Sequence, residues 1–191
     1  TNTVPGMEKN KIKTRFKETI RKNRQIINKQ LNEFFDWVKG AELVSLKECN
    51  TIEDPVRPEL DNEFRTSYGR KIYGVKYKNE IHAIMCFAFT NKIPKSVKDL
   101  DLMSKDAFLQ SAQRDQKVGK IAIAYTVWSK KKGGGKLIVK EVFKMIKKSN
   151  HLNRLITLSP LTDMARNFHL RNGAIEIHVN ESTQNFEYKK L

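Results

Sequence analysis

The chain of 191 residues is poor in several features that mark particular protein classes. Its two cysteines, Cys49 and Cys86, lie far apart in the sequence and favour a reducing compartment over a disulfide framework. No Cys or His spacing resembles a metal site, so no metal is expected. No apolar run approaches membrane-spanning length, and the first residues lack the apolar stretch of a signal peptide. We therefore expect a cytoplasmic protein with no membrane partner.

Acidic residues are scarce relative to basic ones. There are 21 Asp and Glu against 37 Lys and Arg, a net charge of +16. A charge of this size attracts anions, including coenzyme A and nucleic acids. The lysines are spread over the whole chain, and aromatic residues are not interleaved with a basic stripe. Nucleic acid is therefore the weaker candidate partner.

The length favours a single domain. Residues 1–13 are interpreted as a disordered leader, because residues 1–6 ahead of Met7 are typical of a tag, and residues 14–191 as one domain. Apolar residues at helical spacing predict an amphipathic helix over 14–39 with a basic outer face. We expect it to cover the sheet, and a dimerising role is the alternative. Its apolar residues are Phe16, Ile20, Ile27, Leu31, Phe34, Phe35 and Val38.

Further along the chain, residues 48–63 contain proline and acidic residues and are predicted to be a loop. Residues 70–90 are predicted to form two antiparallel strands around a turn at Lys78 and Asn79. Residues 94–119 are interpreted as an insertion with a short helix or two. Closing strands are expected at 175–179 and 186–188.

The most informative segment runs from Lys120 to Ala174. It predicts a strand at 121–128, a loop at 129–136, a helix at 137–148, and a strand at 154–158 that meets Ser159 and Pro160. Three glycines between strand and helix let the backbone approach a ligand closely, and the first amides of the helix favour an anion. The loop lysines add positive charge. The spacing does not match a Walker loop, and no acidic residue stands where a dinucleotide fold needs one.

Two motifs in this segment resemble the Gcn5-related N-acetyltransferase (GNAT) superfamily. Lys130-x-x-Gly133-x-Gly135 is similar to its coenzyme A pyrophosphate loop, with Lys130 in the place of the usual Arg or Gln. Residues 165–173 resemble its A-x-x-x-Y-x-x-x-G helix, with His169 where acetyltransferases typically have a Tyr. The resemblance implies a single α/β (α+β) domain with a mixed, mostly antiparallel twisted sheet, splayed near its middle.

A closer resemblance is to the catalytic domain of malonyl-CoA decarboxylase, a member of the same superfamily. It rests on three blocks within residues 70–178. The first comprises residues 70–74, 84–90 and 92–97, and the second comprises residues 124–127 with the glycine loop. The third is Thr157-Leu-Ser-Pro160 with Asn167-Phe-His-Leu-Arg-Asn-Gly-Ala174, which looks like the family's S-P and F-H-L-x-N-G-A motifs. The large helical domain that precedes the catalytic domain in full-length decarboxylases has no counterpart in this sequence.

This resemblance implies an enzyme that converts malonyl-CoA to acetyl-CoA and CO2, with the coenzyme A thioester as substrate. It assigns the catalytic roles to Ser159 and His169. Taken singly, Ser159 is typical of a turn, His169 of a packed helix residue, and Tyr125 fits the core as well as the site. The coenzyme A contacts are expected from Tyr125, Thr126, Val127, Lys130, Lys132, Gly133, Gly134, Gly135 and Lys136.

Two other functions remain open at this point. An N-acyltransferase would move an acyl group from coenzyme A to an amine on a small molecule, a protein or a nucleic-acid base. It needs a base, and the strand at 121–128 has no Asp or Glu. A basic nucleic-acid-binding module on the same fold would bind DNA with a steep salt dependence. The sequence does not define the acyl group or the oligomeric state.

Overall fold

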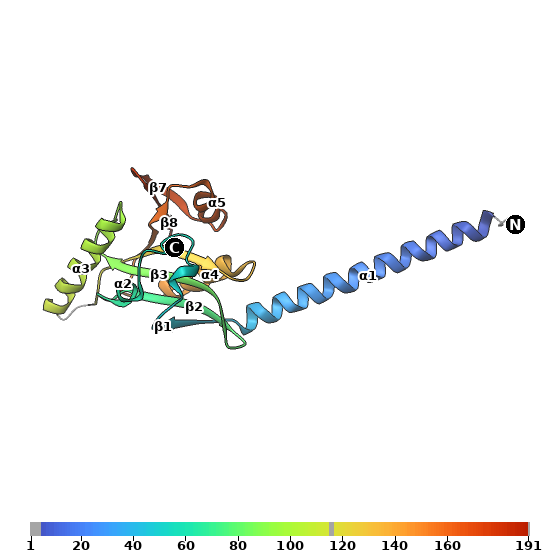
Figure 1. Cartoon of the computed structure of the whole chain (residues 1–191), viewed down its shortest axis with the longest axis horizontal. Helices are drawn as coiled ribbons and strands as arrows, with labels where there is room; N and C mark the ends of the chain where they lie inside the picture. The colour runs from blue at the N-terminus through green and yellow to red at the C-terminus, as the bar shows by residue number, and fades with distance from the viewer. Residues whose placement is uncertain (1–4, 115–116, 191) are drawn as a thin grey trace. The chain divides into compact units, whose positions relative to one another are not determined.

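The computed structural model describes residues 5–114 and 117–190 and divides into two units, Thr1–Ala41 and Glu42–Leu191. The first unit contains one continuous helix, α1 (Pro5–Gly40), drawn in blue in Figure 1. It begins at Pro5 instead of residue 14, so residues 5–13 of the expected leader are helical, and residues 1–4 lie outside the described residues. Large apolar side chains of α1, among them Phe16 and Ile27, are exposed on the helix. That this face covers the sheet stays a prediction.

The second unit is a single α/β domain built on an eight-stranded sheet with the order β1-β2-β3-β4-β5-β8-β6, in which β7 also pairs with β8. All pairings are antiparallel except β4 with β5, so the predicted mixed, mostly antiparallel sheet is confirmed. The strands are β1 (Glu42–Leu46), β2 (Lys71–Tyr77), β3 (Glu80–Thr90), β4 (Ile121–Ser129), β5 (Arg154–Thr157), β6 (Ser159–Pro160), β7 (Ile175–Val179) and β8 (Thr183–Tyr188).

The hairpin of β2 and β3 turns at Lys78 and Asn79, as predicted. Both have positive φ, 47° and 63°, the left-handed conformation that a two-residue hairpin turn requires. Residues 83–88 of β3 are all buried, so both faces of this strand are covered. The helices of the unit are η1 (Thr51–Glu53), α2 (Asn62–Thr66), α3 (Val97–Arg114), α4 (Gly134–Lys148) and α5 (Asp163–Arg171) (Figure 1).

Helix α3 corrects one prediction. Residues 94–119 were expected to hold a short helix or two, but Val97–Arg114 is one helix of 18 residues. Its buried positions, Leu100, Ser104, Ala107 and Ser111, recur every three or four residues, which is the period of a helix face. Two of the four are serines, so the buried face carries little of the apolar signal that sequence patterns detect.

The two cysteines are far apart only along the chain. In the fold both thiols are free; Cys49 Sγ donates to Asn62 Oδ1, and Arg65 Nη1 donates to Cys86 Sγ, each at 3.5 Å. The neighbouring Cys86 thiol is the largest cause that lowers the pKa of Cys49 to about 7, and the charge of Arg65 lowers it further. The Cys49 thiol and burial raise the pKa of Cys86. Strand pairing brings these residues together, which sequence spacing does not reveal.

Candidate active site

The sheet opens between β4 and β5. Their parallel pairing covers Ile121–Ala124 of β4 and ends with the bond that Leu158 N donates to the Ala124 oxygen, at 2.9 Å. Tyr125 forms a bulge at this point, because Cys86 pairs with Thr126 and Phe87 with Ala124. Beyond the bulge β4 continues to Ser129, while Ser159 and Pro160 of β6 pair with β8. This opening is the splay that the GNAT resemblance implied.

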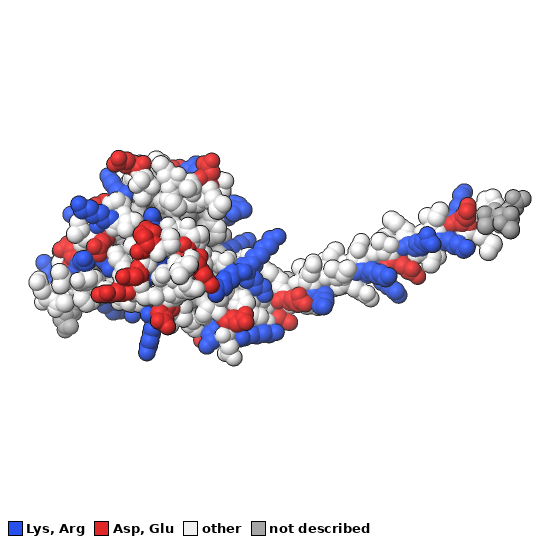
Figure 2. Space-filling view, viewed as in Figure 1, with Lys and Arg blue, Asp and Glu red and all other residues white. Residues whose placement is uncertain are grey.

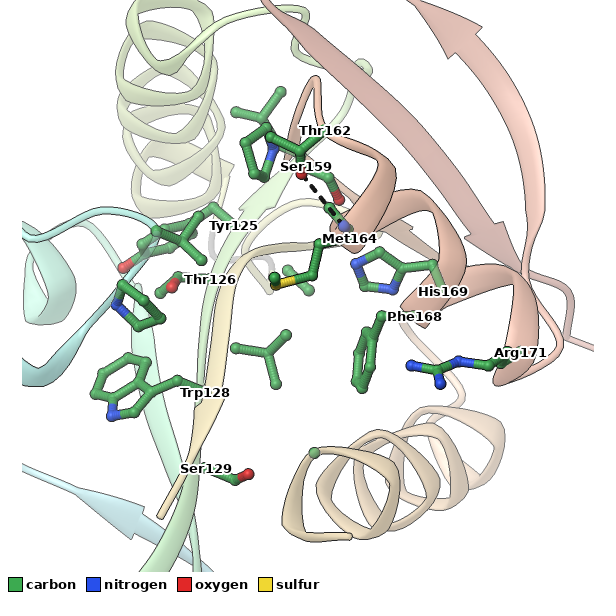
Figure 3. A pocket seen from close by; sticks show the side chains of 18 residues that line it. Tyr125, Thr126, Trp128, Ser129, Ser159, Thr162, Met164, Phe168, His169 and Arg171 are labelled. Atoms are coloured by element: carbon green, nitrogen blue, oxygen red, sulfur yellow. Dashed lines mark hydrogen bonds between the residues drawn. The ribbon is translucent and has the colours of Figure 1, made fainter. Parts of the chain in front are cut away.

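A cavity of about 620 Å³ occupies the opening (Figure 3). One wall comes from residues 124–129 of β4, and the opposite wall from Leu158, β6 and α5, which contributes Met164, Phe168 and His169 among others. In Figure 3 the side chains of Met164 and His169 project from α5 towards β4. Most of the wall residues are apolar, and none of the described residues that line the cavity is Asp or Glu.

A short strap, residues 54–57, joins the two edges of the opening. The Asp54 carboxylate accepts a hydrogen bond from the Thr126 hydroxyl of β4 at 2.7 Å. At the other end, Arg57 donates to the carbonyl oxygen of Leu158 at 3.4 Å. Asp54 is held by a buried ion pair with Arg65 at 2.9 Å, in which both side chains are fully buried. Pro55 and Val56 of the strap consequently form part of the cavity wall.

Helix α5 places His169 in the cavity wall. Its first turn is capped by the Thr162 hydroxyl, which accepts from Ala165 N at 3.2 Å, and Gly173 follows its end with a φ of 94°. Thr162 therefore caps the helix, and Gly173 lies just past its end. His169 is 5% exposed, and its Nδ1 is hydrogen-bonded to the Tyr188 hydroxyl at 2.8 Å. Burial lowers the pKa of His169 to about 4, so the imidazole is neutral at pH 7.

Ser159 lies in the same wall and is 3% exposed. Its hydroxyl donates to the Thr157 hydroxyl at 2.9 Å, and Thr157 also accepts from Phe186 N at 3.1 Å. The structure therefore brings the two predicted catalytic residues to one cavity. Among the described residues Ser159 and His169 are not hydrogen-bonded to each other; each has its own partner.

The glycine loop leads directly into α4. The helix begins at Gly134 instead of residue 137, which corrects the predicted start by including the last two glycines. Gly133 precedes it with a φ of 83°, a conformation that favours glycine, and offers no side-chain cap. A Cβ on Gly134 would lie 2.8 Å from the Ser129 Cβ, so the loop packs against the end of β4. The first-turn amides of α4 thus form an uncapped helix N-terminus, which suits an anion.

The other predicted coenzyme A contacts divide into two groups. Tyr125, Thr126, Val127 and Gly135 line the cavity, whereas Lys130, Lys132, Gly133, Gly134 and Lys136 lie outside its wall. Lys130 forms an ion pair with Glu53 at 3.0 Å, and Lys132 and Lys136 are exposed. Tyr125 fits both interpretations that the sequence left open, because it lines the cavity and is also 1% exposed in the core.

Several residues of the site were not predicted from the sequence. Tyr188 holds His169 and Thr157 holds Ser159, and the strap contributes Pro55 and Val56. Thr157 lies inside the quoted S-P motif, so the sequence already indicated that it is close to Ser159. Tyr188 belongs to a predicted closing strand, but only the pairing of β8 beside β5 brings it to His169. Across residues 5–114 and 117–190 no group of three or more His, Cys, Asp or Glu could hold a metal.

Solved structures of other proteins share this fold. No protein-family model and no curated protein matches the sequence. Among solved structures, malonyl-CoA decarboxylase from Cupriavidus metallidurans aligns over 83% of this chain with a TM-score of 0.57 and 16% identity. The GphF GNAT-like decarboxylase with isobutyryl-CoA aligns over 78% of this chain and 100% of its own, with a TM-score of 0.57 and 9% identity. The chain has the GNAT fold.

A third structure shows that this fold carries more than one reaction. A Bacillus subtilis acetyltransferase in complex with CoA aligns over 79% of this chain and 99% of its own, with a TM-score of 0.52 and 11% identity. This chain spans 64% of the length of the Cupriavidus decarboxylase. Identities of this size show the fold alone, and these three neighbours comprise two decarboxylases and one acetyltransferase.

Proposed function

We propose that this protein decarboxylates a malonyl-type coenzyme A thioester, with Ser159 and His169 as its catalytic residues. The observation that carries the proposal is that a serine hydroxyl and a neutral, buried imidazole line one largely apolar cavity. Decarboxylation needs no second substrate and no base. It needs a site that admits a carboxylate, promotes loss of its hydration and stabilises the charge that develops.

The reaction breaks the bond between the carboxylate carbon and C2 of the malonyl group. The electron pair of this bond passes into the thioester, CO2 leaves, and an enolate with its negative charge on the thioester oxygen remains. C2 then takes up a proton, so that malonyl-CoA and one proton become acetyl-CoA and CO2. The protein must therefore place hydrogen-bond donors at the thioester oxygen before the charge forms.

His169 suits the role of such a donor. When the Tyr188 hydroxyl donates to Nδ1 of His169, the imidazole proton resides on Nε2, the nitrogen left for the cavity. Burial raises the pKa of Tyr188, so its phenol stays protonated. A neutral imidazole donates a hydrogen bond to an enolate oxygen, and one such donor typically contributes about 3 to 4 kcal/mol of barrier lowering.

The lowered pKa of His169 limits what this residue can do in the reaction. With a pKa of about 4, roughly one molecule in a thousand carries an imidazolium at pH 7, which makes His169 a poor proton donor to carbon. We therefore assign the proton on C2 to water that enters as CO2 leaves. Ser159 completes the site: once its hydroxyl turns from Thr157 to the substrate, it donates to the departing carboxylate or to the oxyanion.

The glycine loop would hold the other end of the substrate. The uncapped first turn of α4, with Lys130, Lys132 and Lys136 nearby, matches a pyrophosphate in charge. Gly135 has no Cβ, and its position next to Phe168 would leave room for the pantetheine arm of the substrate to pass between α4 and α5. Tyr125, Thr126 and Val127 would then contact the pantetheine arm along the open edge of β4.

An N-acyltransferase is the second candidate, because the acetyltransferase neighbour shares the fold. Such an enzyme must remove a proton from an ammonium group before the amine attacks. His169 is a weak base when its pKa is about 4, and no described residue lining the cavity is a carboxylate. The decarboxylase therefore requires fewer additional assumptions. Nucleic-acid binding is a third candidate, supported by the net charge of +16 alone.

The test is a mass-spectrometric assay of the purified protein with malonyl-CoA and, in parallel, with acetyl-CoA. We expect malonyl-CoA to be converted to acetyl-CoA and CO2 by the wild type, and the rate to fall at least 100-fold in His169→Gln and Ser159→Ala. His178→Gln is the matched control, because His178 is exposed on β7 and does not line the cavity. Coenzyme A binding without malonyl-CoA turnover, together with amine-dependent release of coenzyme A from acetyl-CoA, would establish the transferase instead.

A further inference from the structure

Helix α1 carries an exposed apolar stripe that repeats every eleven residues. Phe16 is followed by Ile27, and Ile20 by Leu31. Eleven residues make three turns of about 3.67 residues each, close to the natural period of an α-helix, so the stripe runs nearly parallel to the helix axis. Its side chains are largely in solvent, with exposed fractions of 66% for Phe16, 37% for Ile20, 54% for Ile27, 47% for Leu31 and 50% for Phe34.

The rest of the helix surface is strongly basic. Residues 5–40 contain 10 Lys or Arg and 4 Asp or Glu, a net charge of +6. Lys13, Lys17 and Arg24 lie along one margin of the stripe when the sequence is placed on a helical wheel. Lys9 lies in line with the stripe ahead of Ile12, and the other basic residues are spread over the polar side. Figure 2 shows charged side chains along one side of α1, with uncharged surface on the other.

The combination of stripe and charge distinguishes between partners. A second copy of α1 would cover the stripe but would bring two helices of charge +6 together. A nucleic acid would neutralise the charge but would leave the phenylalanine, isoleucine and leucine side chains in water. An anionic lipid surface satisfies both features at once, because acyl chains accept the apolar side chains and the headgroups accept the lysines and arginines.

We propose that α1 binds the surface of a membrane that contains anionic lipid, with its axis in the plane of the interface. From Ile12 to Phe34 the stripe is about 35 Å long at 1.5 Å per residue. Its apolar side chains enter the boundary between headgroups and acyl chains. The stems of Lys13, Lys17 and Arg24 extend along this boundary, and their charged ends reach the headgroup phosphates. This role is independent of the proposed reaction.

Such a helix need not cross the membrane. No described helix is both long and apolar enough to do so. The absence of a long apolar run predicts no membrane-spanning segment, and no membrane partner was expected on that ground. An interfacial helix, however, has low overall hydrophobicity and is recognised by the contrast between its two faces. That contrast is present in α1, where the apolar stripe and the charged side chains occupy different parts of the circumference.

Vesicle co-sedimentation of the full chain tests the proposal, with vesicles of phosphatidylcholine alone and of phosphatidylcholine with 30% phosphatidylserine. Two neighbouring substitutions form a matched pair: Ile27→Glu places a carboxylate at the centre of the stripe, and Asn28→Glu places the same group about 100° further round the helix. Both change the charge by the same amount, and residue 27 is already 54% exposed, so neither is expected to unfold the protein.

We expect binding to the mixed vesicles that is at least tenfold tighter than binding to phosphatidylcholine alone, and that weakens as salt is raised. Ile27→Glu should weaken it at least tenfold more than Asn28→Glu does. Equal effects of the two substitutions would overturn the proposal. Failure to bind the mixed vesicles would also overturn it. In that case light scattering would show whether the protein is a monomer or a dimer that Ile27→Glu dissociates, and either result leaves the proposal overturned.

Discussion

The buried imidazole of His169 makes the stability of the fold depend on pH in a defined window. Burial lowers the pKa of His169 from 6.5 to about 4. The unfolded chain therefore binds this proton more readily than the folded chain between these two values. The contribution of His169 is complete above pH 6.5, where both states are neutral, and stability is lost as the pH falls towards 4. From pH 8 to pH 4.5 this linkage amounts to about 2.5 kcal/mol.

Urea denaturation between pH 4.5 and pH 8, followed by circular dichroism, measures this loss. His169→Gln keeps a polar side chain of similar size but cannot titrate, so the difference between wild type and variant isolates this histidine from the other groups. We expect the free energy of unfolding of the wild type to fall by about 2.5 kcal/mol more than that of the variant over this range. Parallel pH profiles for the two proteins would refute the assignment of a neutral, buried imidazole.

Two further predictions concern the residues that shape the cavity. Arg65→Met should destabilise the fold by about 3 to 5 kcal/mol in urea denaturation, because it leaves the buried Asp54 carboxylate without its ion-pair partner; a loss below 1 kcal/mol would contradict this role. Gly135→Ala places a Cβ 3.0 Å from the Phe168 ring and should push that ring into the cavity. Calorimetry should then show that the affinity for acyl-CoA is reduced about tenfold, while the free energy of unfolding stays within about 1 kcal/mol of the wild-type value. An unchanged affinity would exclude the proposed path of the substrate past Gly135.

The parts of the fold that the sequence predicted well are those specified by neighbouring residues. The hairpin at Lys78 and Asn79 and the order of strand, glycine loop and helix each depend on local chemistry. The predicted start of α4 is too late because glycine is a poor helix former. In the structure the close packing of Gly134 against Ser129 requires a glycine inside the first turn of the helix. The same locality explains why Ser159 and His169 could be proposed from short motifs.

Features that depend on contacts between distant residues could not be predicted. Tyr188 meets His169 only because β8 returns beside β5, and the strap reaches Thr126 from 72 residues away along the chain. The contact between the thiols of Cys49 and Cys86 has the same origin. The serine-containing buried face of α3 was hidden for a different reason, since small polar side chains can be buried in a helix without leaving an apolar pattern.

The pairing between β4 and β5 ends early, at Ala124, so one side of β4 becomes an unpaired edge in the middle of the sheet. Past Ala124, no described strand pairs with β4 on its β5 side, so the backbone groups that point to that side lack a ladder partner. The strap holds this edge through the Asp54 side chain at Thr126, while Arg57 binds Leu158 on the opposite side of the opening. Those amide hydrogens at the end of β4 that point away from β3 are therefore expected to exchange faster than the amides of Ile121–Ala124. A ligand that fills the opening would act as a local clamp on the middle of the sheet.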